Sequence, residues 1–181
     1  MGALQATSLL IRNNCDIMLH INVDVPKNVP AYDRIRAFED TCREHNVPYE
    51  LHLDVTGDSY QDIYAQMRSI FSNIDARYPD KKKGVFLSND TYANMFLNLI
   101  FQKYGCLPDT YELIGFDNSP IAGEAILPIT TIGQQIDVIA HTAMELLVQQ
   151  MEERKKRKPR PLTAPIHKQS IPVLVRRDTT G

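Results

Sequence analysis

The chain has 181 residues, of which 43% are hydrophobic and 23% are charged, and its formal net charge is -2. This is the balance of an ordinary globular domain, or of a piece of a larger one, and it gives the chain as a whole no electrostatic preference for nucleic acid. No apolar run is long enough to span a bilayer, and residues 1–10 lack the pattern of a signal peptide. Cys15, Cys42 and Cys106 are widely spaced and odd in number, which favours reduced thiols in the cytoplasm.

Helical and strand patterns alternate along the chain. Three- and four-residue spacing of apolar residues predicts helices over 4–13, 31–46, 57–74, 91–105 and 135–156, and short apolar or β-branched runs predict strands over 15–23, 49–55, 84–87, 111–116 and 128–134. Residues 77–83 are expected to form a solvated link, and the tail 160–181 to hold two short strands around Pro165 and Pro172. Asp58 or Ser59 is expected to cap the third helix.

This alternation predicts an α/β layered fold with a mainly parallel sheet. Ligands of such sheets bind beyond the carboxyl ends of the strands. Two groups of polar residues follow strands directly: Ser88, Asn89 and Asp90 after one, and Asp117 after the next along the chain. We therefore expect the site at this edge.

Common catalytic and cofactor motifs are absent from the sequence. The glycines are isolated and form no phosphate-binding loop, and no G-x-S-x-G nucleophile elbow occurs. None of the five histidines pairs with a Cys or another His at the spacing of zinc ligands, and we expect His20 and His52 to be structural. We expect no metal, no cofactor and no enzymatic activity.

Two local patterns each have two interpretations. In "LSND", at 87–90, Asn89 or Asp90 is suited to cap the following helix, and the Asn89 amide is also suited to bind a sugar hydroxyl or a base. In "GFDN", at 115–118, the polar pair is typical of an Asx turn and is equally suited to accept hydrogen bonds from ligand hydroxyls.

Two further patterns carry positive charge. Arg34, in "DRIRAF" at 33–38, is either a surface residue or points its guanidinium into the cleft. The basic run at 154–160 follows a helix end that Pro159 stops, so we interpret it as a solvated helix terminus rather than a nucleic-acid site.

Three ordered motifs carry a family resemblance: N-D at 89–90, I-G-F-D-N at 114–118, and P-I-T-T-I-x-Q at 128–134. Together with "PVLVRRDTT" at 172–180 and, more loosely, the segments back to residue 2, they resemble the effector-binding domain of LacI/GalR transcription regulators. The resemblance covers nearly the whole chain. It implies a type I periplasmic-binding-protein-like fold, in which two α/β lobes with helices on both faces of each sheet close on a small molecule.

The resemblance also implies the site. Arg34, Asn89 and Asp117 match the family's effector contacts, and Gln134 is a weaker candidate. Ser59 stands where family members often have an aromatic residue, so Tyr60 is the candidate to replace that stacking surface. Asp90 is then the helix cap and Phe116 a packing residue.

Compared with the family, the sequence begins after the helix-turn-helix and the first strands. We expect a partial domain: a complete carboxyl-terminal lobe at about 14–127 and 160–181, with remnants of the amino-terminal lobe at 1–13 and 128–159. Such remnants expose apolar faces, so we expect either pairing between chains or poor order at residues 1–13.

The function that follows is sensing of a small molecule, expected to be a sugar or sugar phosphate, by a regulator that controls DNA binding allosterically. We expect a cytoplasmic homodimer that contacts operator DNA only through a separate amino-terminal domain, without membrane contact. The alternatives are a solute-binding protein of a sugar transporter and an α/β enzyme. Arg34, Asn89 and Asp117 make a binding set rather than a catalytic one, which disfavours the enzyme.

Overall fold

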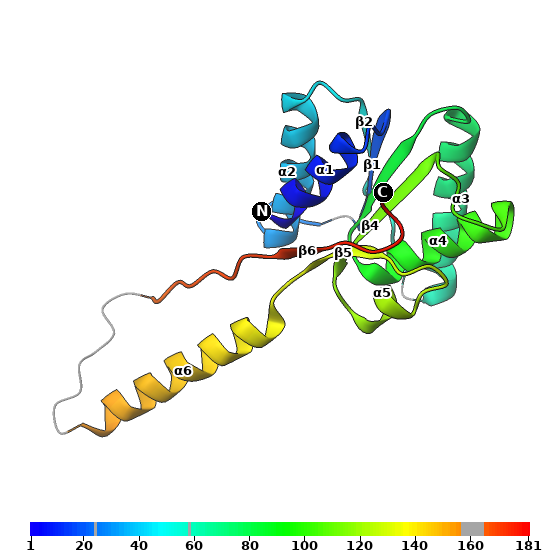
Figure 1. Ribbon diagram of the computed structural model, residues 1–181. Helices are drawn as coiled ribbons and strands as arrows, with labels where there is room; N and C mark the ends of the chain where they lie inside the picture. The colour runs from blue at the N-terminus through cyan, green and yellow to red at the C-terminus, as the bar shows by residue number, and fades with distance from the viewer. Residues whose placement is uncertain (24, 58, 157–164) are drawn as a thin grey trace.

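Six strands form one sheet, in the order β2-β1-β3-β4-β5-β6, in the computed structural model (Figure 1). The structure describes residues 1–23, 25–57, 59–156 and 165–181. All neighbouring strands are parallel except β5 and β6, which pair antiparallel. The strands are β1 (Ile17–Ile21), β2 (Tyr49–His52), β3 (Lys83–Leu87), β4 (Tyr111–Asp117), β5 (Thr130–Gly133) and β6 (Val173–Val175).

Helices cover both faces of this sheet (Figure 1). α1 (Gly2–Arg12) and α2 (Pro30–Glu44) lie on one face, while α3 (Tyr60–Arg77), α4 (Asp90–Tyr104) and the short α5 (Pro120–Glu124) lie on the other. Each face has its own apolar core, one including Phe38 and Phe86, the other Phe71 and Phe96. The predicted α/β fold with a mainly parallel sheet and helices on both faces is confirmed.

β3 begins earlier than predicted. Lys83, which we expected in a solvated link, is 1% exposed, and its Nζ donates to the carbonyl oxygens of Tyr78 at 2.7 Å and Lys81 at 2.8 Å. The ammonium also lies 4.5 Å from the centroid of the Tyr111 ring. A lysine can begin a buried strand here because its charge is held by carbonyl dipoles and a ring face.

α1 belongs to the same body as the rest of the sheet. Its apolar side chains Ala6 and Leu10 are fully buried in one core with Phe38 of α2 and Phe86 of β3. The expectation that residues 1–13 are a poorly ordered or exposed remnant of another lobe is therefore wrong, because their apolar stripe is buried between α2 and the sheet. Residues 130–133, which we also assigned to the other lobe, form β5 within this sheet.

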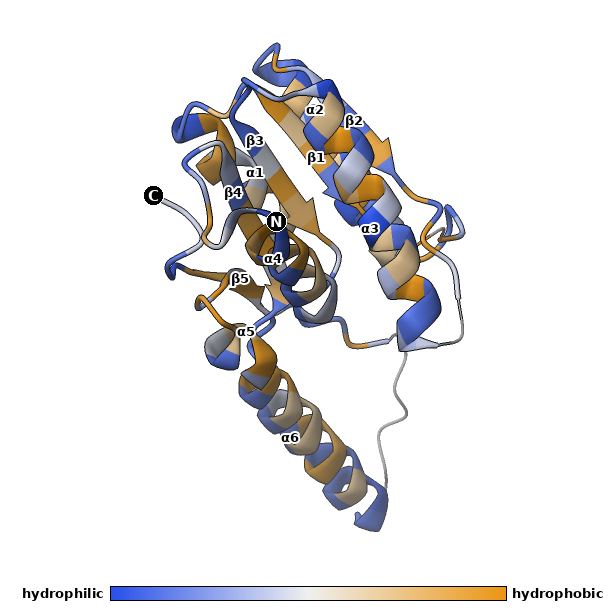
Figure 2. Ribbon diagram, turned by 90° about the vertical axis from the view of Figure 1, so that its right-hand side faces the viewer, coloured by the Kyte–Doolittle hydropathy of each residue, from blue (hydrophilic) through white to orange (hydrophobic). Residues whose placement is uncertain are grey.

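α6 (Ile136–Lys155) extends away from this body (Figure 1). None of its residues is buried, and Figure 2 shows hydrophobic residues along its length. Its large exposed apolar side chains are Ile136, Val138, Ile139, Met144, Leu147, Val148 and Met151. Within the described residues 128–156, the exposed apolar face expected of residues 128–159 is found in α6.

The described residues 165–172 contain no strand, and β6 follows Pro172. The residues before Pro165 in the other predicted strand lie outside the described residues. The end of α6 contains the first cations of the basic run, and residues 157–160, with Pro159, lie outside the described residues. No helix in the described part of the chain is long and apolar enough to cross a membrane.

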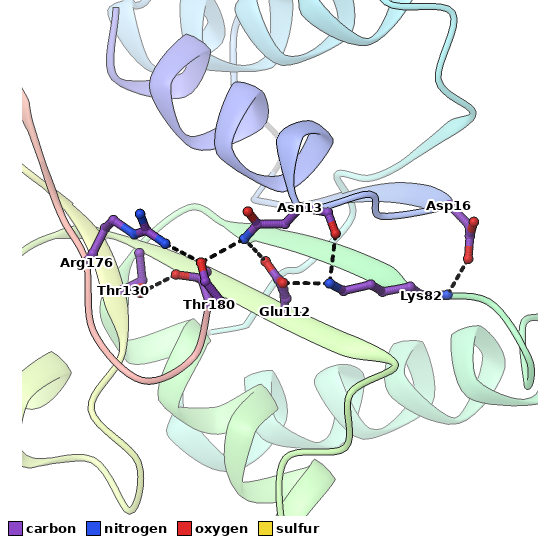
Figure 3. A network of polar contacts seen from close by, with 8 residues as sticks. Asn13, Asp16, Lys82, Glu112, Thr130, Arg176 and Thr180 are labelled. Carbon is purple, nitrogen blue, oxygen red and sulfur yellow. Dashed lines mark hydrogen bonds and ion pairs between the residues drawn. The ribbon is translucent and has the colours of Figure 1, made fainter.

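Polar contacts close the amino-terminal edge of the sheet (Figure 3). The Nζ of Lys82 lies 2.8 Å from an oxygen of Glu112 and donates to the carbonyl of Asn13 at 2.8 Å, and Asn13 donates to the other Glu112 oxygen at 2.6 Å. The backbone amide of Lys82 donates to Asp16 at 2.7 Å. These groups bind one another, whereas the residues predicted to contact a ligand lie at or beside the opposite, carboxyl-terminal edge.

Candidate functional site

Four of the five predicted site residues lie at the carboxyl-terminal edge of the sheet or beside it. Asn89 follows β3, Asp117 ends β4, Gln134 follows β5, and Arg34 is in the first turns of α2. They share this edge because the carboxyl ends of parallel strands meet there. Asp117 and Gln134 line one pocket, Arg34 lines another, and Asn89 lines neither. The four residues are far apart in the sequence, so the pairing of the strands places them at this edge.

Arg34 points toward the sheet rather than into solvent. Its Nη1 donates to the carbonyl oxygen of Ser88 at 3.0 Å, and its guanidinium carbon lies 3.9 Å from the centroid of the Phe116 ring. Burial lowers the pKa of Arg34, while the charge of Asp117 acts in the opposite direction. The surface interpretation of Arg34 is therefore wrong, and its remaining N–H donors face a small pocket.

That pocket has a volume of about 160 Å³ and lies between α1 and α2. It is lined by Met1, Gly2, Ala3, Asp33, Arg34, Ala37 and Phe116. Phe116 forms its floor as well as packing in the core, so the packing role that we expected for it is only part of its contribution. Phe116 could have been suspected from the sequence, because it precedes Asp117 on the same strand.

Asn89 is the cap of α4. Its Oδ1 accepts a hydrogen bond from the backbone amide of Tyr92 at 2.8 Å. Its Nδ2 donates to no described residue, so the cap is compatible with the binding role, which stays a prediction. Asp90, the cap that the resemblance implied, instead accepts hydrogen bonds from Ser119 and Thr131.

Asp117 and Gln134 are in direct contact. The Gln134 Nε2 donates to Asp117 Oδ1 at 2.5 Å. Both line a pocket of about 290 Å³, together with residues of the β5–α6 connection and of β6. Asp117 has a backbone φ of 104°, a conformation that is strained for any residue except glycine. A carboxylate held in a strained backbone, with one oxygen toward a pocket, fits binding of ligand hydroxyls.

Tyr60 stands apart from this set. It is the first residue of α3, is 57% exposed, and stacks on Tyr64 with ring centroids 5.9 Å apart. It lines neither of the two pockets above. Ser59, next to it, is the cap of α3 and accepts from the amide of Asp62 at 3.2 Å, as expected, while the other candidate cap, Asp58, lies outside the described residues.

Two buried residues, Ser88 and His20, lie next to these side chains but were not among the predicted ligand contacts. The Ser88 hydroxyl is buried and makes no hydrogen bond to any described residue, although its carbonyl holds Arg34. His20 is fully buried, and its Nδ1 donates to the carbonyl of Phe86 at 2.9 Å. Burial, with the charge of Arg34 adding to it, lowers the pKa of His20 to about 4. The neutral imidazole stacks on Phe86 and lies against Phe38 in the core, which fits the structural role expected of it.

Comparison with known proteins identifies relatives along nearly the whole chain. The model of the periplasmic binding protein-like domain matches residues 9–180. The ribose operon repressor of Halalkalibacterium halodurans is 28% identical over 155 residues, which are 84% of this chain and 44% of the repressor. The HTH-type transcriptional repressor PurR of Vibrio vulnificus is 25% identical over 154 residues, which are 85% of this chain and 45% of that protein. The chain thus spans less than half the length of these relatives.

A solved structure shares the fold. The LacI family transcriptional regulator from Enterococcus faecium, determined with bound ribose, superimposes with a TM-score of 0.74 at 19% sequence identity. The alignment covers 99% of this chain and 62% of that one.

Proposed function

The chain belongs to the periplasmic binding protein-like domain family, and from this we propose that it is the sugar-sensing part of a LacI-type transcriptional regulator. The observation that carries the proposal is the placement of Arg34, Asn89 and Asp117 at one edge of the sheet, where the motifs of the family lie. The relatives are transcriptional repressors, which favours a regulator over the solute-binding protein of a transporter. In this proposal the protein is cytoplasmic and is not an enzyme.

We propose ribose or a related sugar as the effector. One relative is a ribose operon repressor, and one solved structure of this fold holds ribose. The chemistry supports this choice, because Asp117 accepts hydrogen bonds while Arg34 and the Asn89 amide donate them, as vicinal hydroxyls require. Tyr60 lines neither pocket, so it can cover the sugar only where a second lobe closes over both α3 and the carboxyl-terminal edge of the sheet.

Thermal unfolding of the 181-residue chain with D-ribose, cellobiose or hypoxanthine tests the proposal. A ligand at a hundred times its dissociation constant stabilises the folded state by about 2.7 kcal/mol and raises Tm. We expect ribose to do so, and we expect Arg34→Met and Asp117→Ala to remove the shift. Arg36→Met is the matched control, because Arg36 is exposed on the same helix. Equal shifts in the Arg34 and Arg36 variants would contradict the site.

We also propose that the protein is a homodimer and that contact with operator DNA belongs to a helix-turn-helix domain outside these 181 residues. The exposed apolar residues of α6 support association, either with a second copy or with the remainder of the amino-terminal lobe. Sedimentation velocity tests the dimer. Leu147→Glu is expected to yield monomer and Gln149→Glu, also exposed on α6, to leave the dimer intact. A wild-type chain that stays monomeric at high concentration contradicts self-association.

A further inference from the structure

Asp90 has a different environment from the other polar residues at the strand ends. It is the first residue of α4, and it is 1% exposed. Its Oδ2 accepts from both the backbone amide of Ser119, at 2.7 Å, and the Ser119 hydroxyl, at 3.0 Å. Its Oδ1 accepts from the Thr131 hydroxyl at 2.5 Å. One buried carboxylate thus contacts the connection after β4 and the strand β5.

These contacts converge on the turn that presents Asp117. The amide of Asn118 donates to the Thr131 hydroxyl at 3.3 Å, and that hydroxyl in turn donates to Asp90. Asp117 and Asn118 both have positive φ, 104° and 52°, and only the second lies in the left-handed region that asparagine tolerates. A strained residue persists only where its surroundings hold it in place. Asp90 holds both residues that follow Asp117 in the chain, Ser119 directly and Asn118 through Thr131.

The glycine of the I-G-F-D motif makes room for this carboxylate. A Cβ added to Gly115 would lie 2.3 Å from Asp90 Oδ1 and 3.3 Å from the Ala93 Cβ. Any side chain at this position would push Asp90 away from β4. Gly115 and Asp90 therefore form one structural unit, although 24 residues separate them in the sequence and only the strand pairing of β3 with β4 brings them together.

Burial raises the pKa of Asp90, and its hydrogen bonds with Thr131 and Ser119 oppose that effect. The charge of Asp117 adds to the rise, which indicates that the two carboxylates interact through space. A carboxylate with three donors and almost no exposed surface has little capacity to bind a ligand itself. We therefore look for its role in the residues that it holds in place.

We infer that Asp90 is a positioning residue, which holds the turn at 117–119 so that the Asp117 carboxylate faces Gln134 and the ligand pocket. The inference rests on the proposed function for its effect on sugar binding. The structural part of the inference, that Asp90 holds the turn at 117–119 in place, can be tested without any ligand. Asp90 differs in this from Asn89, its neighbour, whose side chain caps the helix.

The first measurement is hydrogen exchange on the 181-residue chain, resolved for the peptides that contain residues 117–119. Asp90→Asn keeps the shape of the side chain but replaces one accepting oxygen with a donor, so either Ser119 or Thr131 loses its acceptor. We expect at least about tenfold faster exchange within 117–119. It should appear at Ser119 if its own acceptor is lost, or at Asn118 if Thr131 is released from Asp90.

Asp75→Asn is the matched control. Asp75 is also buried, 6% exposed, and accepts from the hydroxyls of Tyr104 and Tyr111 and from Lys103, away from the turn. We expect this variant to lose stability in urea to a similar extent while exchange at 117–119 stays at the wild-type rate. The control thus separates general destabilisation from loss of the local contact.

The second measurement is the dissociation constant for D-ribose. We expect Asp90→Asn to raise it at least about tenfold and Asp75→Asn to leave it within about twofold. Thr131→Val, which removes the hydroxyl that joins Asn118 to Asp90, serves if Asp90→Asn does not fold. It should speed exchange at Asn118 but not at Ser119, whose acceptor on Asp90 remains.

The outcomes separate the two proposals. Faster exchange at 117–119 in Asp90→Asn, with no ribose binding by the wild-type chain, supports the pinning of the turn and contradicts ribose as effector. Unchanged exchange in Asp90→Asn, or in Thr131→Val where that variant is used, overturns the positioning role whether or not ribose binds. Unchanged ribose affinity despite faster exchange overturns the claim that the turn governs binding.

Discussion

Gln134 donates a hydrogen bond to Asp117 across the ends of β4 and β5, with 2.5 Å between the side-chain nitrogen and oxygen. The bond joins two residues that the sequence places in separate motifs. It uses one of the two carboxylate oxygens of Asp117, which lines the pocket of about 290 Å³ and has a strained backbone.

The backbone strain at Asp117 predicts an inverted order of stability between two variants. At most positions alanine is more stable than glycine, but at φ 104° glycine relieves strain of about 1–3 kcal/mol that alanine retains. We expect Asp117→Gly to be more stable than Asp117→Ala by about 1 kcal/mol or more, although both lose the Gln134 contact. Urea unfolding measures the difference.

The control pair is Asp109→Gly and Asp109→Ala. Asp109 is exposed and is not among the described residues with positive φ. There alanine should be at least as stable as glycine. The same order at both positions would show that Asp117 is not strained in solution.

The close approach of Gly115 to Asp90 predicts that one added methyl group lowers the free energy of unfolding, and that the loss depends on the side chain at position 90. Gly115→Ala places its Cβ against Asp90 Oδ1, and we expect a loss of about 1–3 kcal/mol or more from overpacking. Asp90→Ala removes that oxygen, so the double variant should be more stable than the sum of the single losses predicts, by about 1 kcal/mol. A double-mutant cycle in urea measures the coupling, and additive losses would contradict the contact.

His20 predicts pH dependence between its ordinary pKa of 6.5 and its folded value of about 4. In this window the unfolded chain binds a proton that the folded chain does not, so stability is complete above pH 6.5 and falls as the pH is lowered toward 4. The loss amounts to about 2 kcal/mol by pH 5.

Urea unfolding between pH 7.5 and 5 checks this, with His20→Gln as the variant. It should be less stable at pH 7.5 but lose less on acidification, and a smaller slope should remain because burial also lowers the pKa of His52. His141→Gln, at a side chain 77% exposed, should retain the wild-type slope. Identical slopes in His20→Gln and the wild type would mean that His20 titrates normally.

The burial of Lys83 and its two hydrogen bonds to carbonyl oxygens predict that this charge stabilises the fold. Lys83→Met keeps the length of the side chain but leaves the carbonyls of Tyr78 and Lys81 without a donor, and we expect a loss of about 2 kcal/mol or more. Lys81→Met, at an exposed neighbour, should change stability by less than about 0.5 kcal/mol. A Lys83→Met protein as stable as the wild type would place the ammonium in solvent.

The sequence by itself determined the fold class and the edge at which the site lies. Apolar runs such as 111–116 and helical stripes such as Ile35 and Phe38 are local patterns, and their alternation is sufficient to predict a parallel sheet with helices on both faces. Because parallel strands end at a common edge, the position of Asp117 at the end of a strand could also be predicted, and the motif resemblance added Arg34, Asn89 and Gln134 to it.

Only the tertiary structure decided which residues hold these side chains in place. An aspartate at the start of a helix, such as Asp90, is typical of a helix cap. Nothing near it in the sequence reveals that Ser119 and Thr131 are its partners. The same holds for Lys83, whose burial depends on carbonyls in the preceding loop, and for α1, whose stripe fits between α2 and the sheet. Local periodicity specifies an element and its apolar face, whereas the partner of a polar side chain depends on which elements the chain packs together.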